Sequence, residues 1–360
     1  MVVVLRDKLV SDSLDIVCMV DGVPLETVIG VSYEQTVNSA RIVRIRLGGI
    51  DSIHLIMIGG KVVLKGGRNE TVKNLNFKGI ILQTVPSYTE SEIVAVDYIT
   101  FLQTSEVVEY KQQDLIGEDL YYLAAVACNY KDIDTTNLIE GSGIKATADI
   151  NLAGLQTRRQ FIEKCFRHLV EIKVDTSHPE PIAVRWRYGI RRDNIMDFWL
   201  EDPTNFKVEP IVTLSEHSDN LIGPGLVSKI DSTQLVNSAT FQSSNNLDLY
   251  ATITDNDSVA KYGVHGKLHR FNTDRYDRLE ELAYETVLMN KEPTLTYRIV
   301  MSNGEHISIG DYIRIRHLSF DKDIILPVVE VTHQLTETIE SIIVVGTPEL
   351  STGEYIASLL

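Results

Sequence analysis

The stretch from Asn237 to Gly346 constrains the fold most, because the order of its elements suits a β-rich scaffold. An alternating segment, Leu247–Thr254, comes first, and a helix rich in acidic residues follows it. The remaining strand-like segments are Tyr297–Val300, Ile309–Ile315 and Pro327–His333. Nowhere in this stretch do a nucleophile, a base and an orienting group occur at catalytic spacing. The pattern indicates a scaffold rather than an enzyme.

Length and composition indicate a folded protein of several domains. A chain of 360 residues exceeds the usual size of one core, so we expect two to four domains. Hydrophobic residues make up 44% and charged residues 23%, as in ordinary globular proteins. The longest apolar runs are far shorter than the ~20 residues that cross a bilayer, and the N-terminal residues lack the pattern of a signal peptide. We therefore expect no membrane span and synthesis in the cytoplasm without export.

The charge balance argues against a nucleic-acid-binding protein. Fifty acidic residues against 34 basic residues give a net charge of −16, whereas duplex binding requires clustered Lys and Arg. The densest basic cluster, Arg185–Arg192, alternates like a strand with cations on one face. Its interleaved aromatic residues could stack on bases. A solvated or interface-facing strand end is the interpretation we favour.

The N-terminal region has the pattern of a small sandwich or barrel. A strand at Asp15–Val20 leads into the turn Asp21-Gly22 and a return strand at Leu25–Val31. In the next segment Ile42, Ile45 and Leu47 alternate imperfectly with three arginines. The further expected strands are Arg41–Leu47, His54–Ile58, Lys61–Lys65, Phe77–Val85 and Glu92–Tyr98. Their short, regular spacing is typical of sandwiches and barrels.

The middle region mixes helices and strands. Leu120, Leu123, Ala124 and Ala127 recur at helical spacing. Thr157 and Gln160 match a capping box that begins a second helix. Strands are expected at Ile182–Tyr188 and Met196–Leu200, and a loop or hinge at Pro203–Gly225, which carries three prolines.

The last region returns to strands around one helix, expected from Asp274 to Met289 and followed by Pro293. The final strands are expected at Tyr312–Ile315, Ile325–Thr332 and Glu340–Val345. The fold class is therefore β-rich α+β. The expected divisions are residues 1–105, a middle α+β region at 106–225, a region at 226–350 with the inserted helix 274–289, and a tail at 351–360.

The tetrapeptide Val-Asn-Ser-Ala occurs twice, at 37–40 and at 236–239, each time before a strand. A shared tetrapeptide is near chance level in a chain of this length. The strand, glycine turn and strand that recur at Met57–Val63 and Ile307–Ile313 are stronger signs of two similar ends.

Landmarks at both ends resemble those of tail hub proteins in phage-like machines. These include baseplate hub proteins of contractile tails, the late control protein D family and the hub portion of type VI secretion spike proteins. The landmarks in the C-terminal region are Asn237, Asp257-Ser258, Tyr262-Gly263, the helix after Asp274, Gly310-Asp311 and Val328–His333. The N-terminal ones are Val20–Gly22, Ile58–Gly60, and Phe77–Ile80 before a strand that ends in Asp97. Residues 105–225 resemble the family by position alone.

The resemblance implies two small β-barrel domains joined by the middle α+β region. Three chains would then form a pseudo-sixfold ring that adapts a six-fold tail tube to a three-fold spike or tip, around a channel for the genome. The expected partners are two further copies and the tube, spike or tip, tape-measure, and baseplate wedge or distal tail proteins. DNA would touch the protein only in transit, and an acidic channel wall would keep it from adhering. The expected location is the virion tail, assembled in the host cytoplasm, and neither an enzymatic activity nor a cofactor is implied.

Several groups of residues could bind a metal ion or catalyse a reaction, but a structural role is favoured for each. Asp255–Ser258 has oxygen donors at calcium-like spacing but lacks the glycine and distal glutamate of an EF-hand, so capping of a strand end is favoured. His306, His317 and His333 could converge on a metal, but three ordinary histidines are favoured. The pairs Glu118-Asp119 and Glu280-Glu281 could serve a glycosidase, but solvated acids are favoured. Cys18, Cys128 and Cys165 are interpreted as small core residues. The alternative function is a tail-associated β-rich hydrolase or a carbohydrate-binding module.

Overall fold

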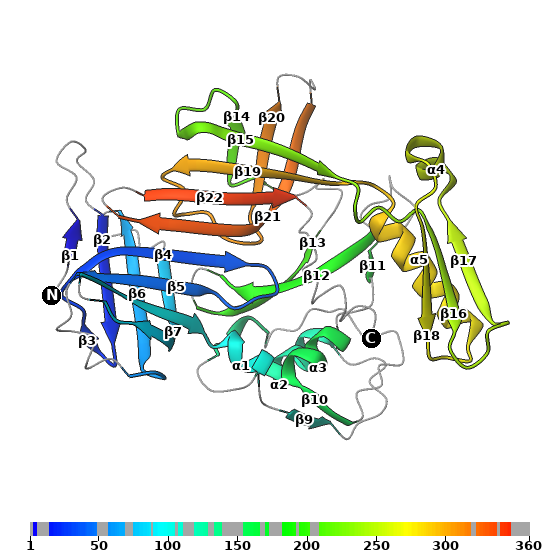
Figure 1. Cartoon of the computed structure of the whole chain (residues 1–360), viewed down its shortest axis with the longest axis horizontal. Helices are drawn as coiled ribbons and strands as arrows, with labels where there is room; N and C mark the ends of the chain where they lie inside the picture. The colour runs from blue at the N-terminus through cyan, green and yellow to red at the C-terminus, as the bar shows by residue number, and fades with distance from the viewer. Residues whose placement is uncertain are drawn as a thin grey trace. The chain divides into compact units, whose positions relative to one another are not determined.

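The chain forms two compact units, each assembled from separated stretches of sequence (Figure 1). The computed structural model describes residues 3–5, 14–48, 57–68, 75–87, 89–104, 107–110, 119–128, 133–138, 154–165, 170–172, 182–191, 194–201, 209–317, 322–336 and 339–346. Unit 1 comprises Met1–His168, Arg185–Leu226 and Arg298–Val345, and unit 2 comprises Leu169–Val184, Val227–Tyr297 and Gly346–Leu360. Within the described part, every helix is too short or too polar to reach across a membrane.

A fourteen-stranded sheet carries most of unit 1. Its strands lie in the order β1-β2-β6-β7-β8-β5-β4-β21-β22-β19-β15, with β3 beside β2 and β20 between β14 and β21. The strands of the first hundred residues are β1 Val3–Leu5, β2 Leu14–Val20, β3 Val23–Pro24, β4 Val28–Thr36, β5 Ile42–Gly48, β6 Lys61–Arg68, β7 Leu75–Val85 and β8 Glu90–Asp97. The later strands are β14 Val212–Ser215, β15 Leu221–Asp231, β19 Thr294–Ser302, β20 Tyr312–His317, β21 Lys322–Leu335 and β22 Ile339–Gly346.

Alternation of apolar and polar residues explains why these segments are strands with one buried face. In β5, for example, Val43, Ile45 and Leu47 are fully buried, while Arg44 and Arg46 between them are partly exposed or exposed. A large buried cluster fills the N-terminal part of the sheet and also takes in Leu335 and Ile339. Burial of each large apolar side chain contributes about 1.5–3 kcal/mol to folding.

The strand pairing joins the two ends of the chain. β4 pairs antiparallel with β21, so that Tyr33 lies beside His333 and Val31 beside Leu335. The expected turn at Asp21-Gly22 is present, with positive φ angles of 48° and 81° that suit a two-residue turn. The strand that returns to β2 is the short β3 rather than the expected Leu25–Val31, since β4 pairs with β5 and β21. The β-rich fold class is thus confirmed. The pairings among the described residues close no barrel, so the two-barrel arrangement stays a prediction.

The expectation of a loop or hinge over Pro203–Gly225 is wrong for much of that stretch. β14 lies within it and pairs parallel with β20, and β15 begins at Leu221. Pro224 is tolerated because β15 is the last strand in the sheet order, and an edge strand does not need every N–H for the ladder. Residues 202–208 of this stretch, and His54–Leu55-Ile56 of an expected strand, lie outside the described part.

The helices of unit 1 are α1 Ile99–Thr104, α2 Leu120–Cys128 and α3 Arg158–Cys165, with the short 3-10 turn η2 Thr136–Leu138. The predicted capping box is confirmed: the Gln160 N–H donates to Thr157 Oγ1 at 3.1 Å and the Thr157 N–H to Gln160 Oε1 at 2.9 Å. Two small sheets complete the middle region, β9 Val107–Tyr110 with β10 Gly154–Thr157, and β11 Val170–Ile172 with β12 Ile182–Ile190 and β13 Met196–Glu201.

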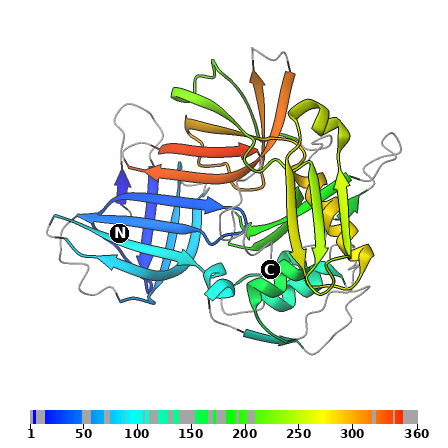
Figure 2. The same cartoon turned by 45° about the vertical axis from the view of Figure 1, so that its right-hand side comes forward.

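Unit 2 holds a three-stranded sheet with one helix packed on it (Figure 2). Its strands lie in the order β17-β16-β18, and α5 occupies the position expected for the inserted helix. The bounds are β16 Ser238–Ser243, β17 Tyr250–Thr254, α4 Asn256–Tyr262, β18 Gly266–Phe271 and α5 Tyr276–Asn290. Leu279, Ala283 and Val287 of α5 pack on Ala239, Phe241 and Ala251 of the sheet. The helix α4 was not expected from the sequence.

Candidate functional site

The eight residues that the resemblance singles out fall into two groups, one in each unit. Asn237, Asp257, Ser258, Tyr262 and Gly263 gather around α4 in unit 2, and Gly310, Asp311 and His333 lie in unit 1. Their roles as family landmarks stay a prediction. Their contacts, described next, show what each group holds in place.

Asn237 anchors the region around α4. It is fully buried, and its Nδ2 donates to the Gly263 carbonyl at 2.7 Å and to Ser258 Oγ at 3.2 Å. Its Oδ1 accepts the N–H of His265 at 2.7 Å. Ser258 Oγ in turn donates to the carbonyl of Lys291, just after α5, at 2.5 Å. One asparagine side chain therefore connects β16, α4 and β18.

The residues at both ends of α4 act as helix caps. Asp255 accepts the Ser258 N–H at 2.8 Å, and its other oxygen accepts from Lys291 Nζ at 3.0 Å. These bonds hold the pKa of Asp255 below its usual range. Gly263 ends the helix with φ of +80°. Asp257 is exposed in the first turn, and the Tyr262 hydroxyl donates to Glu292. Capping of a strand end was expected at Asp255–Ser258, but the structure shows that Asp255 caps the N-terminus of the helix α4 instead.

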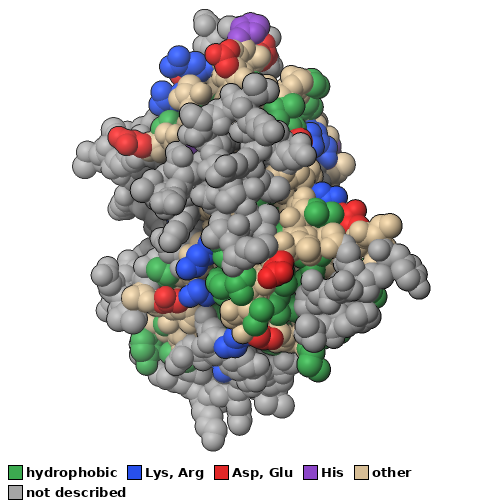
Figure 3. Space-filling view, turned by 90° about the vertical axis from the view of Figure 1, so that its left-hand side faces the viewer, with side chains coloured by type: hydrophobic (Ala, Val, Ile, Leu, Met, Phe, Trp, Pro, Cys, Tyr) green, Lys and Arg blue, Asp and Glu red, His purple; other side chains and the backbone are tan. Residues whose placement is uncertain are grey.

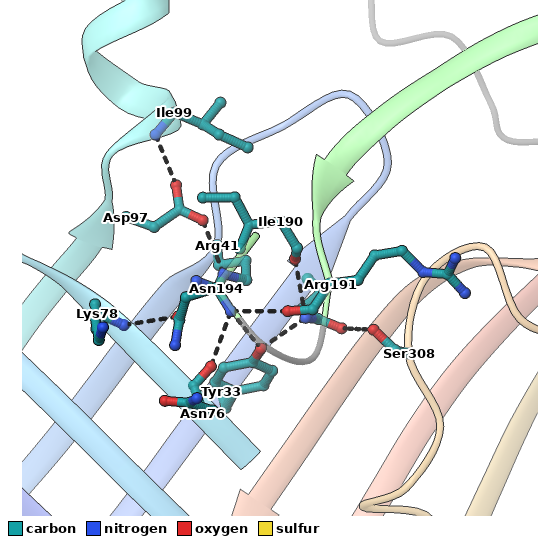
Figure 4. A network of polar contacts seen from close by, with 11 residues as sticks. Tyr33, Arg41, Asn76, Lys78, Asp97, Ile99, Ile190, Arg191, Asn194 and Ser308 are labelled. Carbon is teal, nitrogen blue, oxygen red and sulfur yellow. Dashed lines mark hydrogen bonds and ion pairs between the residues drawn. The ribbon is translucent and has the colours of Figure 1, made fainter. Parts of the chain in front are cut away.

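A second polar cluster, which we call the junction, surrounds Arg41 in unit 1 (Figure 4). Arg41 and Asp97 are 1% and 0% exposed, and Arg41 Nε donates to Asp97 Oδ2 at 2.8 Å. Nη2 donates to Asn194 Oδ1 at 2.7 Å, and Nη1 to the Asn76 carbonyl at 2.9 Å and the Tyr33 hydroxyl at 3.2 Å. A buried charge is tolerated because its donors are satisfied in this way.

The junction extends from Tyr33 toward the C-terminal strands. Gln35 Nε2 donates to the Tyr33 hydroxyl at 2.6 Å, and Ser308 Oγ donates to Gln35 Oε1 at 3.0 Å. Asn194 Oδ1 also accepts the N–H of Lys78 at 3.1 Å. The junction therefore joins residues around 33–41, 76–97, 194 and 308, which are remote in sequence (Figure 4).

The electrostatics of the junction follow from its burial. Burial raises the pKa of the Asp97 carboxyl, and the Arg41 guanidinium beside it opposes that shift. Burial likewise raises the pKa of the Tyr33 hydroxyl. The Arg41 guanidinium also lies over the Phe77 ring, 5.4 Å from its centroid. The contacts tie these groups to one another and to backbone carbonyls.

Gly310 and Asp311 shape the turn before β20. Gly310 has φ of +77°, and a Cβ atom there would lie 2.9 Å from the Trp199 ring. Asp311 Oδ2 accepts the Ser308 N–H at 2.8 Å, and Oδ1 accepts from Arg191 Nη2 at 3.1 Å. Arg191 also pairs with Asp197 at 3.3 Å. The turn is thereby fixed against the strands β12 and β13.

The His333 side chain lies in the buried interior beside the sheet. It is 1% exposed, stacks on Tyr33 with 5.9 Å between ring centroids, and its Nδ1 lies 2.9 Å from Ser341 Oγ. Burial lowers its pKa to about 4, and nearby His306 adds to that effect. No group of three His, Cys, Asp or Glu side chains in the described ranges could hold a metal ion.

The two Val-Asn-Ser-Ala tetrapeptides share a hydrogen-bonding pattern. The Asn38 N–H donates to the Tyr188 carbonyl at 2.8 Å, and Asn38 Oδ1 accepts the Tyr188 N–H at 3.0 Å. The Asn237 N–H donates to the His265 carbonyl at 3.1 Å, and Asn237 Oδ1 accepts the His265 N–H at 2.7 Å. Each asparagine thus clamps a distant segment by the same two bonds, although the tetrapeptide alone carried little weight.

The remaining candidate residues that the structure describes are buried in the core or make contacts that stabilise helices. Cys18 and Cys128 are buried free thiols, as predicted, and burial raises the pKa of each to about 12. The N–H of Tyr122 donates to Asp119 at 3.4 Å, which caps α2, and Glu281 on α5 accepts from Arg278. The side chains of Cys165, Glu118 and His317 lie outside the described part.

Two arginines of the basic cluster, Arg187 and Arg191, have described side chains, and both contact the protein itself. Arg187 is 6% exposed, and Arg191 pairs with Asp197 and Asp311 while lying over the Trp199 ring. On the face drawn in Figure 3, the described Lys and Arg side chains are interspersed with Asp and Glu. A solvated or interface-facing strand end was expected, whereas Arg187 and Arg191 face other parts of the protein itself.

Comparisons with known proteins identify the fold. No protein-family model matches the chain, and no curated protein matches its sequence. Among solved structures, the tail protein from Neisseria meningitidis MC58 aligns with a TM-score of 0.64 at 12% identity, over 96% of this chain and 99% of that one. The 43 kDa tail protein of prophage MuSo2 from Shewanella oneidensis aligns with a TM-score of 0.62 at 12% identity, over 92% and 97%. The chain therefore has the fold of these tail proteins.

The junction is the feature that sequence reasoning missed. Asp97 was noted as a strand end and Arg41 as part of an alternating segment, but their pairing was not expected. The available signal was the register of β5: Arg41 lies on the same side as Val43 and Ile45, which are fully buried. A charged residue in an inward-facing register predicts a buried partner.

Proposed function

We propose that this protein is a non-enzymatic structural hub of a virus tail baseplate or tail tip. The observation that supports this most is the whole-chain likeness to two tail proteins, which covers at least 92% of each chain compared.

In this proposal three chains form a ring of pseudo-sixfold symmetry around an axial channel. The strand-rich regions 1–105 and 226–350 supply two barrel-like lobes per chain, and the middle region 106–225 joins them. The ring adapts a six-fold tube to a three-fold spike or tip and contacts the tape-measure and baseplate wedge or distal tail proteins. DNA passes through the channel, whose wall is acidic in keeping with the net charge of −16.

Mass in solution and particle images test the proposal together. One chain has a mass of 40.4 kDa, so three chains give 3 × 40.4, about 121 kDa. We expect a particle of that mass that appears in electron micrographs as a ring with a central hole, and no release of sugars from cell-wall polymers. A monomer that cleaves or binds glycans would overturn the hub and favour a hydrolase or a carbohydrate-binding module.

A further inference from the structure

The outer edge of β17 presents unused backbone groups. Asp255 N–H donates to the Asn237 carbonyl and Ser243 N–H to the Leu249 carbonyl, both at 2.9 Å. In an antiparallel ladder, hydrogen-bonded pairs alternate with non-bonded ones. Ala251 and Ile253 therefore direct their N–H and C=O groups toward β16. The same groups of Tyr250, Thr252 and Thr254 point outward, where no described strand pairs with them.

This edge lacks the features that ordinarily block strand addition. β17 reads Tyr-Ala-Thr-Ile-Thr, without a charged residue or a proline, and its register with β16 is regular. The opposite edge strand, β18, carries Lys267 and Arg270. Charges, prolines and bulges are the usual protection of free edges. The strand is also anchored to the core of unit 2, since Ala251 is 2% exposed and packs against α5.

The chemistry of the edge specifies its occupant. Outward N–H and C=O groups at every second residue are matched only by an extended polypeptide. Asp248 and Asp257 are exposed just beyond the two ends of the strand. A segment with Lys or Arg beyond each end of an uncharged stretch complements this arrangement.

A second copy of the chain fits this edge poorly. If two β17 strands paired antiparallel about Thr252, Asp248 of one copy would lie next to Asp257 of the other. The net charge of −16 on each chain adds repulsion at longer range. We propose that β17 binds an extended, basic-flanked segment of a different protein by strand addition. The proposal does not rest on the ring described above.

A proline at position 252 isolates the backbone contribution. Thr252→Pro removes one outward N–H without removing a bond to β16, and Thr252→Val is the matched control because both variants lose the hydroxyl bond to Thr240. The probe is a fluorescent peptide, Lys-Lys-Val-Thr-Val-Thr-Val-Lys-Lys. We expect wild type and T252V to bind it in an anisotropy titration and T252P to bind about tenfold more weakly.

Further measurements distinguish a basic segment of another protein from other partners that could bind the edge of β17. The same peptide with glutamate in place of lysine should not bind, and hydrogen exchange should show protection of the Thr252 amide in wild type on adding the lysine peptide. That exchange result decides the matter if T252P does not fold. Absence of binding to wild type, or equal binding by T252P, overturns the proposal. Self-association of wild type that T252P abolishes also overturns it, in favour of a second copy. Ring formation by T252P, measured separately, reports on the hub.

Discussion

Arg41 contacts several separate stretches of unit 1 from a fully buried position. Arg41→Met would leave the buried Asp97 carboxylate without its cation and would remove one of the two donors to Asn194 Oδ1. Breaking a fully buried ion pair costs about 3–5 kcal/mol. We therefore expect the free energy of unfolding, measured by urea denaturation, to fall by about that amount. The matched control is Arg44→Met on β5, whose side chain is 43% exposed beside Glu34. It should cost no more than about 1 kcal/mol, and an equal loss in both variants would contradict the role of the junction.

His333 makes the stability of unit 1 depend on pH. Its pKa is about 4 in the folded protein against 6.5 in the unfolded chain. Between these values the unfolded state binds more protons, so stability falls as the pH falls through this window. We expect a loss of about 2 kcal/mol between pH 7 and pH 5 that is missing in His333→Gln. Denaturation at both pH values checks this, with the exposed His217→Gln as control. A similar loss in H333Q would refute the assignment to His333.

At the scale of residues, sequence reasoning succeeded where the signal is local. The Thr157 capping box and the Asp21-Gly22 turn depend on neighbours within a few positions, and both are present. The junction could not be derived in this way. Its members come from four separate stretches, and only the folded chain shows that Arg41 meets Asn194 at a separation of 153 residues.

At the scale of elements, the capping box of α3 offers a direct measurement. Thr157→Ala removes the oxygen that accepts the Gln160 N–H, and loss of such a cap costs about 1 kcal/mol. Thr157→Ser keeps an equivalent hydroxyl and should retain most of that stability. Thermal unfolding of the two variants checks the order. Equal stability of the alanine and serine variants would mean that the cap contributes nothing.

The elements that sequence reasoning missed have identifiable causes. Three prolines suggested a loop over Pro203–Gly225, but Pro224 lies on an edge strand, where a missing N–H costs little. The helix α4 is only seven residues long and shows no apolar period, so its cap residues were its only signal. The sequence identified Asp255 as the cap of a strand end, whereas in the structure it caps this helix.

At the scale of the whole molecule, the sheet depends on pairing between distant parts of the chain. β4 and β21 bring residues near 33 and 333 together. Hydrophobic alternation predicts that each strand has a buried face but does not specify its neighbour. For this reason the β-rich class could be predicted from the sequence, whereas the division into two units assembled from separated stretches could not.

The net charge of the whole chain makes a prediction about DNA. Binding to a duplex requires basic side chains that can neutralise phosphates. Here the chain carries −16, Arg187 is buried, and Arg191 is paired with two carboxylates. We expect no anisotropy change for a labelled duplex at about 50 mM salt, with any dissociation constant weaker than about 10⁻⁴ M. A basic DNA-binding protein serves as positive control. Saturable binding that weakens steeply with salt would reveal a basic surface and contradict passage of DNA along an acidic wall.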